Sequence, residues 1–258
     1  PHRQTTHHTT MTAIESIASP GRHRPPRGRG DAVRVDLWLS RIDTDRTADS
    51  DPCPRWLDDA ERDRAGRFHF ELDRARFVCR RSFLREVLAH YLEVEPQQVR
   101  LRTTAHGRPE LAGDSDVRLN ASHSAGLAVV AVTRGPSVGV DIERRRPIEG
   151  VLDLADGLFH EREAGWLRAM PDGDRSAAFL RLWTRKESFV KALGYGLSIP
   201  LDRFEVLSAG DDGAGRPVGP LGPLPCVFSD LDDLDGYVGA VTVAGGEARP
   251  RIELVERA

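Results

Sequence analysis

The sequence predicts an α+β fold, because segments with helical and with strand periodicity occur in both halves of the chain. With 258 residues and 39% hydrophobic content, the chain can bury one good-sized core or two small packed lobes. The expected strands are short and separated by Gly, Pro and Asp stretches, which favours antiparallel pairing over a parallel α/β sheet.

The N-terminal end of the chain has the composition of a disordered tail. Residues 1–31 are rich in Thr, His, Pro, Gly and Arg and have no apolar period. We expect order to begin with a half-buried strand over 33–39, where apolar and polar residues alternate. Asp58 or Asp59 can then cap a helix that runs toward His69.

A longer amphipathic helix is expected over 73–92, with apolar residues at helical spacing and arginines on its other faces. Strands are then expected over 117–119, 127–133 and 138–142. The turn residues 134–137 (Arg-Gly-Pro-Ser) join the last two strands, so we expect these two strands to form an antiparallel hairpin.

Two more helices are expected in the second half of the chain, over 160–170 and 175–193. Gly194-Tyr195-Gly196 follows the second helix and should end it with a glycine C-cap. The remaining strands are short, and the sequence places them at 204–207, 226–229, 237–243 and 252–255.

Composition excludes several classes of protein. The three cysteines are far apart and lack CxxC spacing, so neither a disulfide framework nor a zinc site is expected, and without a secretory signal we expect a cytoplasmic protein. No apolar run approaches the roughly 20 residues that a membrane span needs, so no membrane role is expected. The net charge of −3 argues against a nucleic-acid partner.

The segment 139–143 (Gly-Val-Asp-Ile-Glu) alternates apolar residues with carboxylates. On a strand, Asp141 and Glu143 therefore share one face, and Val140 and Ile142 lie on the opposite, core-facing side. Two carboxylates this close repel each other, and a hard divalent cation such as Mg²⁺ removes that repulsion. The alternative is an exposed strand end that pairs with the arginines at 144–146.

The segment 182–193 holds the only two lysines of the chain, Lys186 and Lys191, and the other 35 of the 37 basic residues are arginines. On a helix, Trp183, Glu187 and Lys191 form a column at i, i+4 and i+8, with Lys186 beside Glu187. Compact ammonium groups around a carboxylate suggest a phosphate site. An ordinary surface Glu–Lys pair, with Trp183 in the core, is the alternative.

A third motif, 120–124 (Asn-Ala-Ser-His-Ser), precedes an apolar strand. Ser122 and His123 would point to opposite faces of an extended chain, which argues against a nucleophile and base pair. Their side chains either bind a phosphate or tie down a turn, and the sequence leaves both open. A fourth motif, Gly107-Arg108-Pro109, is a turn that presents Arg108.

Together, in this order and spacing, the four motifs resemble the Sfp-type (surfactin-type) 4′-phosphopantetheinyl transferases. That family shows GRP or GKP, N-x-SHS, G-(V/I)-D-(I/V/L)-E and W-x-x-K-E-(S/A)-x-x-K followed by G-x-G-L. The matching segments here are GRP at 107–109, NASHS at 120–124, GVDIE at 139–143, WTRKESFVK at 183–191 and GYGL at 194–197. The resemblance runs from about Trp56 to Phe204.

The resemblance implies two similar α/β lobes in a pseudo-twofold arrangement, with coenzyme A in the cleft between them. The lobes would span 32–136 and 137–258, after the disordered tail of 1–31, and the second lobe would carry the metal-site motifs. The family also implies a monomer.

The resemblance further implies roles for single residues. Asp141, Glu143 and Glu187 would hold Mg²⁺, with Glu187 also a candidate general base. Lys191 would contact the pyrophosphate of coenzyme A, and Lys186 would support the carboxylate cluster.

A second group would surround the adenine and 3′-phosphate end of coenzyme A, and it comprises Arg64, Arg108, Ser122 and His123. The sequence departs from the family pattern nearby, where Glu61 replaces a basic residue and Phe77 a threonine type. Other arginines, such as Arg62, Arg67 or Arg76, could complete the grip on the phosphate.

The implied reaction is transfer of the 4′-phosphopantetheine arm of coenzyme A to a serine of an apo acyl, polyketide or peptidyl carrier protein, with release of 3′,5′-ADP. Two rivals use the same residues. A magnesium-dependent phosphohydrolase would release its product to water, and a non-catalytic member would bind coenzyme A or carrier protein only.

Overall fold

The computed structural model describes residues 32–42, 54–104, 107–194, 199–207, 214–219, 222–224, 226–231, 234–245 and 248–255. The expected tail of 1–31 and the Tyr195-Gly196-Leu197 part of the GYGL motif lie outside these residues. Among the described helices, none combines the length and the apolar character that crossing a membrane requires.

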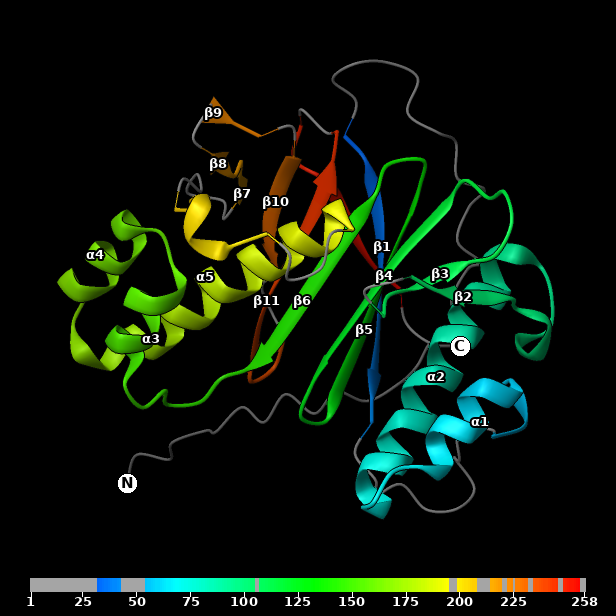
Figure 1. The fold of residues 1–258 in the computed structure, drawn as a ribbon. Coiled ribbons are helices and arrows are strands. Elements are labelled where there is room, and N and C mark those ends of the chain that lie inside the picture. Colours follow the sequence, from blue (N-terminus) through cyan, green and yellow to red (C-terminus); the bar gives the residue numbers. More distant parts are fainter. Residues whose placement is uncertain are drawn as a thin grey trace, which may run out of the picture.

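Helices and sheets are mixed along the chain, and two four-stranded sheets form its centre (Figure 1). The first sheet has the order β12-β1-β5-β4, and the second has the order β6-β11-β10-β7. The strands of the first sheet are β1 (Arg34–Arg41), β4 (Val117–Ser124), β5 (Leu127–Arg134) and β12 (Arg251–Val255). Those of the second are β6 (Val138–Arg144), β7 (Ala214–Gly215), β10 (Cys226–Leu231) and β11 (Tyr237–Ala244).

Two small hairpins and five α-helices complete the described fold. The hairpins pair β2 (Leu101–Thr103) with β3 (Pro109–Leu111), and β8 (Val218–Gly219) with β9 (Gly222–Pro223). The helices are α1 (Asp59–Gly66), α2 (Glu71–Leu92), α3 (Val151–Leu158), α4 (Glu161–Ala169) and α5 (Asp172–Leu193). Short 3-10 turns lie at Pro54–Trp56, Pro96–Gln98 and Leu201–Arg203.

The predicted helix ends are confirmed where a capping residue signalled them. Asp58 accepts a hydrogen bond from the Glu61 amide, and the Glu61 carboxylate accepts one from the Asp58 amide, so the two residues form a capping box for α1. Gly194 ends α5 with φ of 77°, the left-handed conformation that glycine adopts at low cost. Helix α3 was not predicted from the sequence.

The apolar residues form layers that run from α2 through both sheets to α5. Residues of α2, among them Val87 and Leu88, pack on the first sheet against Val130 and Val132. The opposite face of that sheet packs on the second sheet, where Val140 and Ile142 of β6 are fully buried, as predicted.

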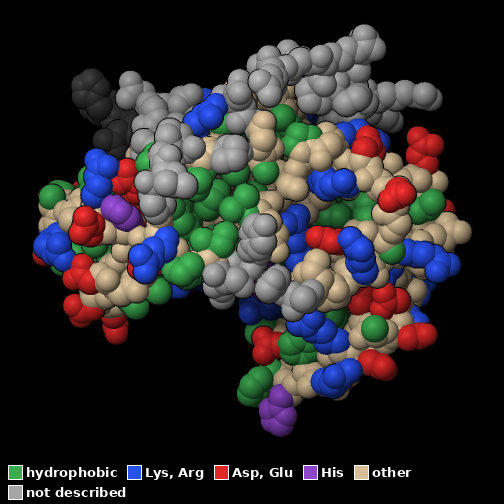
Figure 2. All heavy atoms as spheres, turned by 45° about the horizontal axis from the view of Figure 1, so that its top comes forward, with side chains coloured by type: hydrophobic (Ala, Val, Ile, Leu, Met, Phe, Trp, Pro, Cys, Tyr) green, Lys and Arg blue, Asp and Glu red, His purple; other side chains and the backbone are tan. Residues whose placement is uncertain are grey.

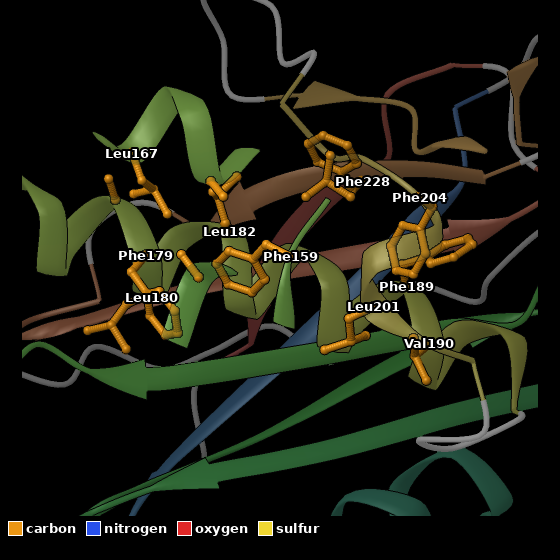
Figure 3. Packing of buried hydrophobic residues seen from close by; sticks show 14 of the residues in the cluster. Phe159, Leu167, Phe179, Leu180, Leu182, Phe189, Val190, Leu201, Phe204 and Phe228 are labelled. Carbon is orange, nitrogen blue, oxygen red and sulfur yellow. The ribbon is translucent and has the colours of Figure 1, made fainter. Parts of the chain in front are cut away.

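The outer face of the second sheet is covered by α5 and its neighbours. Figure 3 shows this cluster, in which Phe189 of α5 lies beside Phe204 with ring centroids 4.7 Å apart. Phe159, which follows α3, stacks on Phe179 of α5 at 4.8 Å. Aromatic burial of this kind fixes α5 on the sheet, and α5 carries two of the predicted site residues.

The predicted hairpin of the strands at 127–133 and 138–142 is wrong. β5 already has β1 and β4 as its two hydrogen-bonded neighbours, whereas β6 pairs with β11 of the other sheet. The chain crosses between the sheets at Gly135, whose φ is 95°. The turn predicted at 134–137 is present, but a turn does not require the strands on either side of it to pair with each other.

One further prediction needs correction, and one strand pairs outside its expected lobe. The segment 204–207 forms a single bridge between Glu205 and Val218 and no strand. β12, which lies within the expected C-terminal lobe of 137–258, pairs in parallel with β1 of the first sheet. A division of the chain at residue 137 therefore does not separate the strands of the two sheets.

The edge strands β4 and β6 lie side by side where the two sheets meet, and we call this line of contact the seam. The side-chain oxygen of Asn120 in β4 accepts a buried hydrogen bond of 2.9 Å from the Val140 amide of β6. This bond uses an edge amide that no strand pairs with, so the seam is bridged by a side chain and not by a ladder.

Gly139 allows α5 to approach β6 at backbone distance. A Cβ atom at this position would overlap the carbonyl oxygen of Ser188 and the amide nitrogen of Ala192. Both of these atoms belong to the backbone of α5 and cannot move aside alone, so the helix would have to shift.

Gly139→Ala should therefore lower the free energy of unfolding by at least about 1–3 kcal/mol, the usual cost of overpacking. Urea denaturation followed by circular dichroism measures this change. Gly157→Ala in α3 is the matched control, because a Cβ atom there meets nothing within 4 Å. Equal stabilities for the two variants would contradict the close approach.

Candidate functional site

The candidate site lies on the seam, beside α5. β6 contributes Asp141 and Glu143, whose register positions on the strand are two apart, and α5 contributes Glu187 and Lys191, one turn apart. The close approach at Gly139 brings this turn of α5 to the strand. The structure thus gathers the three carboxylates that the sequence motifs singled out and one of the two lysines, Lys191.

Asp141 is the most buried of the three carboxylates that the motifs singled out, with a relative exposure of 5%. Its Oδ1 atom accepts hydrogen bonds from Lys191 Nζ at 2.6 Å and from Ser122 Oγ at 2.7 Å. Its Oδ2 atom is buried without a hydrogen-bond partner among the described residues. One oxygen of this carboxylate is therefore occupied by protein contacts and the other is not.

Glu143 is held in a similar way at the end of β6. Its Oε2 atom accepts a hydrogen bond of 2.7 Å from Ser124 Oγ and lies 3.5 Å from Nη1 of Arg146. Ser124 Oγ also accepts a bond of 3.1 Å from the Arg144 amide. Alternate residues of β4, Ser122 and Ser124, thus hold alternate carboxylates of β6.

Glu187 completes the cluster from the helix side. Burial raises the pKa of its carboxyl group, the negative charges of Asp141 and Glu143 raise that pKa further, and Lys191 opposes both effects. Its Oε1 atom is buried and has no hydrogen-bond partner in the described part of the chain.

The donor set suits Mg²⁺, which favours a few carboxylate oxygens together with water and substrate phosphate. Two buried carboxylate oxygens without partners, Asp141 Oδ2 and Glu187 Oε1, are the atoms that a cation would satisfy. The side chains of the described residues are not already drawn together as a group of three metal ligands. A cation would therefore have to draw Glu187 and the two strand carboxylates closer.

The face of β4 opposite the serines carries His123, which meets a basic part of α2. Arg80 donates a hydrogen bond to His123 Nε2. Burial lowers the pKa of His123 to about 4, and the nearby charges of Arg80, Lys191 and Arg76 contribute to this shift. The neutral imidazole therefore accepts from an arginine that has lost part of its own solvation.

A cavity of about 240 Å³ opens beside His123, and Arg64, Arg80 and Arg81 are among the residues that line it. The guanidinium carbons of Arg64 and Arg81 lie 5.3 and 5.7 Å from the ring centroid of Phe77. Burial and mutual repulsion lower the pKa values of Arg80 and Arg81. Positive groups that repel one another around a cavity favour an anion within it.

Figure 2 shows the charged character of this half of the molecule. Its right-hand part, where Figure 1 has α1, α2, β2 and β3, carries many basic side chains interspersed with acidic ones. Apolar side chains gather instead on the left of the centre, in the half that contains α5. The arginine-lined cavity belongs to the right-hand part, because α2 supplies Arg80 and Arg81.

The two departures from the family pattern have structural partners. Glu61 forms an ion pair of 2.7 Å with Arg85, which is only 1% exposed, and lies 3.6 Å from Arg81. It therefore neutralises charge inside the first half of the chain. Phe77 supplies an aromatic face to Arg64 and Arg81 where the family has a hydroxyl.

Arg108, which was expected beside coenzyme A, is engaged by backbone carbonyl oxygens. Its guanidinium donates hydrogen bonds to the carbonyl oxygens of Lys191 at 2.5 Å, Leu119 at 2.8 Å and Val138 at 3.3 Å. These carbonyls belong to α5, β4 and β6. Arg108 therefore joins the seam to the end of α5.

The structure does not bring Lys186 to the carboxylate cluster that it was expected to support. Its ammonium group is fully buried and bonds to Glu163 Oε2 at 2.7 Å and to the carbonyl oxygens of Leu201 at 2.7 Å and Phe204 at 2.6 Å. Glu163 also accepts a bond of 2.7 Å from the Val206 amide. This ion pair ties α4 and the segment around Leu201 to α5.

Sequence reasoning missed three residues of this arrangement, Ser124, Arg80 and Glu163. The alternation of Asn120, Ser122 and Ser124 on one strand face was a usable signal for the first. Neither Arg80 nor Glu163 had a signal, because their partners are 43 and 23 positions away in the sequence.

A carboxylate cluster beside an arginine-lined cavity is typical of enzymes that act on phosphorylated substrates. Comparison with known families identifies the chain further. Residues 137–241 match the 4′-phosphopantetheinyl transferase superfamily, and residues 48–135 match the N-terminal part of 4′-phosphopantetheinyl transferases.

Individual relatives agree with this assignment. The 4′-phosphopantetheinyl transferase HetI of Nostoc sp. is 34% identical over 231 residues, which cover 88% of this chain and 95% of HetI. The 4′-phosphopantetheinyl transferase Sfp of Bacillus subtilis is 31% identical over 184 residues, 71% of this chain and 80% of Sfp. The L-aminoadipate-semialdehyde dehydrogenase-phosphopantetheinyl transferase of Xenopus laevis is 34% identical over 164 residues, 59% of this chain and 54% of that protein.

The chain therefore belongs to the 4′-phosphopantetheinyl transferase superfamily, as its motifs indicated. Members of this family transfer the phosphopantetheine of coenzyme A to carrier proteins, and this chain is such a transferase.

The buried pair of Lys186 and Glu163 leads to a stability prediction. Lys186→Met leaves Glu163 without its counter-charge and should lower the free energy of unfolding by about 3–5 kcal/mol. The double variant Glu163→Gln/Lys186→Met removes both charges and should recover much of that loss, as measured by urea denaturation. The Mg²⁺ dependence of transfer, which we propose below, should be the same in both variants as in the wild-type chain. If the Mg²⁺ requirement shifted while the stability stayed the same, Lys186 would have to act on the carboxylate cluster as first expected.

Proposed function

We propose that this chain transfers the 4′-phosphopantetheine arm of coenzyme A to a serine of an apo acyl, polyketide or peptidyl carrier protein, with Mg²⁺ held by Asp141, Glu143 and Glu187. The observation that carries the metal assignment is the pair of buried carboxylate oxygens without partners, Asp141 Oδ2 and Glu187 Oε1. Coenzyme A would lie in the cleft between two similar lobes, one on each side of the seam; the chain passes from one lobe to the other near residue 137, and β12 returns to the first sheet.

In the proposed reaction, the residues of the site have separate roles. The serine oxygen of the carrier attacks the β-phosphorus of coenzyme A, the bond to the α-phosphate oxygen breaks, and 3′,5′-ADP leaves. The serine proton goes to Glu187, directly or through a water molecule, because burial raises the pKa of this carboxyl group and makes it a better proton acceptor than an exposed glutamate. Bound Mg²⁺ supplies charge neutralisation at the pyrophosphate.

Lys191 lies where it can serve both the carboxylates and a phosphate. Its ammonium contacts Asp141 Oδ1, Ser122 Oγ at 3.3 Å and the Val140 carbonyl at 3.3 Å. A side-chain exposure of 27% leaves it open to the solvent side, where the pyrophosphate would approach. Catalysis would then rest on positioning and electrostatic stabilisation.

The 3′-phosphate end of coenzyme A fits the cavity beside His123, with Arg64, Arg80 and Arg81 as the positive groups. Arg108 and Ser122 would act indirectly, since their side chains are engaged in the seam. We further propose a monomeric, cytoplasmic enzyme that binds neither nucleic acid nor membrane.

The proposed reaction is tested by intact-mass measurement of an apo carrier protein incubated with the chain, coenzyme A and Mg²⁺. The carrier should gain the mass of the phosphopantetheine arm, and EDTA or Asp141→Ala should abolish the gain because each removes the cation. Consumption of coenzyme A without a gain on acyl, polyketide or peptidyl carriers would indicate a phosphohydrolase. A chain that binds coenzyme A without consuming it would be a binding protein only.

The His123 environment gives a prediction that does not depend on turnover. In the free protein the imidazole should titrate near pH 4, because burial and the neighbouring arginines disfavour its charged form. Addition of 3′,5′-ADP should raise this pKa, since a phosphate beside the ring stabilises the imidazolium. Arg80→Ala should also raise it in the absence of any ligand. Imidazole chemical shifts followed by NMR against pH measure both changes. If 3′,5′-ADP left the titration of His123 unchanged, the proposal that its phosphate binds in this cavity would be wrong.

A further inference from the structure

Both metal-ligand candidates on β6 are held from the neighbouring sheet. Ser122 Oγ donates to Asp141 Oδ1 at 2.7 Å, and Ser124 Oγ donates to Glu143 Oε2 at 2.7 Å. The serines are two residues apart on β4 and the acids two apart on β6. Each carboxylate therefore has one oxygen fixed across the seam, which orients the other.

Ser124 differs from Ser122 in what surrounds its acid. Asp141 is almost buried and also bonds to Lys191, whereas the Glu143 side chain is 25% exposed at the end of its strand. The Ser124 hydroxyl holds the Glu143 carboxylate, and the same hydroxyl accepts a hydrogen bond of 3.1 Å from the Arg144 amide. One hydroxyl thus fixes both the Glu143 carboxylate and the backbone that follows it.

Arg146 competes for the same carboxylate. Its Nη1 atom lies 3.5 Å from Glu143 Oε2, and its side chain is 52% exposed. If the bond from Ser124 were lost, attraction to Arg146 would turn Glu143 toward solvent and away from Asp141. The weak, exposed ion pair could then strengthen at the expense of the cluster.

We propose that Ser124 is a positioning residue for the divalent cation: it holds Glu143 across the seam, against the pull of Arg146, so that the free oxygen of this carboxylate faces Asp141 and Glu187. This inference rests on the proposed function, because it assigns Ser124 to the proposed metal site. It also makes the cation site depend on both sheets, since two of its three proposed ligands come from the second sheet and the serines that hold them come from the first. Partners of this kind commonly change metal affinity by about 10–100-fold.

The test measures Mn²⁺ binding to the purified chain in the presence of coenzyme A, by the loss of the free Mn²⁺ signal in electron paramagnetic resonance. Ser124→Ala should weaken Mn²⁺ binding by about tenfold or more and raise the half-maximal Mg²⁺ concentration for transfer. The KM for coenzyme A at saturating Mg²⁺ should stay unchanged. Ser124→Thr keeps the hydroxyl and should restore binding.

Two further variants separate positioning from a general structural role. Ser40→Ala removes a strand serine whose bond, to the Arg41 carbonyl, is long at 3.4 Å, and it should change nothing. Arg146→Gln added to Ser124→Ala removes the competing charge and should recover much of the Mn²⁺ affinity. Unchanged Mn²⁺ binding in Ser124→Ala, or no recovery in the double variant, would overturn the proposal. If the wild-type chain binds Mn²⁺ but modifies no carrier protein, the proposed function fails while the role of Ser124 stands.

Discussion

The contact between the edge strands β4 and β6 is the constraint on which the rest of the structure depends. Edge strands expose backbone groups that must find partners, and here the partners are side chains. The Asn120 side-chain oxygen accepts a hydrogen bond from the Val140 amide, while the Arg108 guanidinium donates hydrogen bonds to the carbonyl oxygens of Leu119 and Val138. Because the two edges are not joined by a continuous ladder, the alternating side chains of both strands remain available along the seam. The serines of one edge meet the acids of the other for this reason.

Helix α5 converts this seam into a site, and its two lysines show how. Lys186 and Lys191 are five residues apart, which places them roughly 140° apart around a helix. Lys186 therefore lies against Phe204 and Glu163, whereas Lys191 points to Asp141. The buried ion pair of Lys186 and Glu163 holds α5 on the side away from β6, and the absence of a side chain at Gly139 lets α5 approach β6 on the other side. The position of Lys191 and Glu187 over the strand follows from both contacts together.

The sequence predicted those parts of the site in which local periodicity decides direction. Alternation in Gly-Val-Asp-Ile-Glu placed Asp141 and Glu143 on one face, and helical spacing aligned Glu187 with Lys191. The sequence could not predict contacts between distant segments. The partners of Arg108 and Lys186 were therefore missed, because a charged side chain can be buried only where another part of the chain supplies its partner. For the same reason the turn at Gly135 predicted a reversal of the chain but not the change of sheet. The C-terminal strand β12 could not be assigned to the first sheet because period-two alternation does not identify the neighbouring strand.

The unpartnered oxygens of Asp141 and Glu187 link the stability of this fold to its chemistry. A buried acceptor without a hydrogen bond costs about 1–3 kcal/mol, so the fold without a cation bears such a cost at two atoms. Lys191 offsets only part of it, because its ammonium contacts Asp141 Oδ1 and leaves Oδ2 free. A cation that satisfies both oxygens would remove this cost and bring the three negative charges together without repulsion. In the proposed site, this cost would then contribute to cation binding, and the same two serines that tie the sheets together would position the two strand carboxylates for the cation.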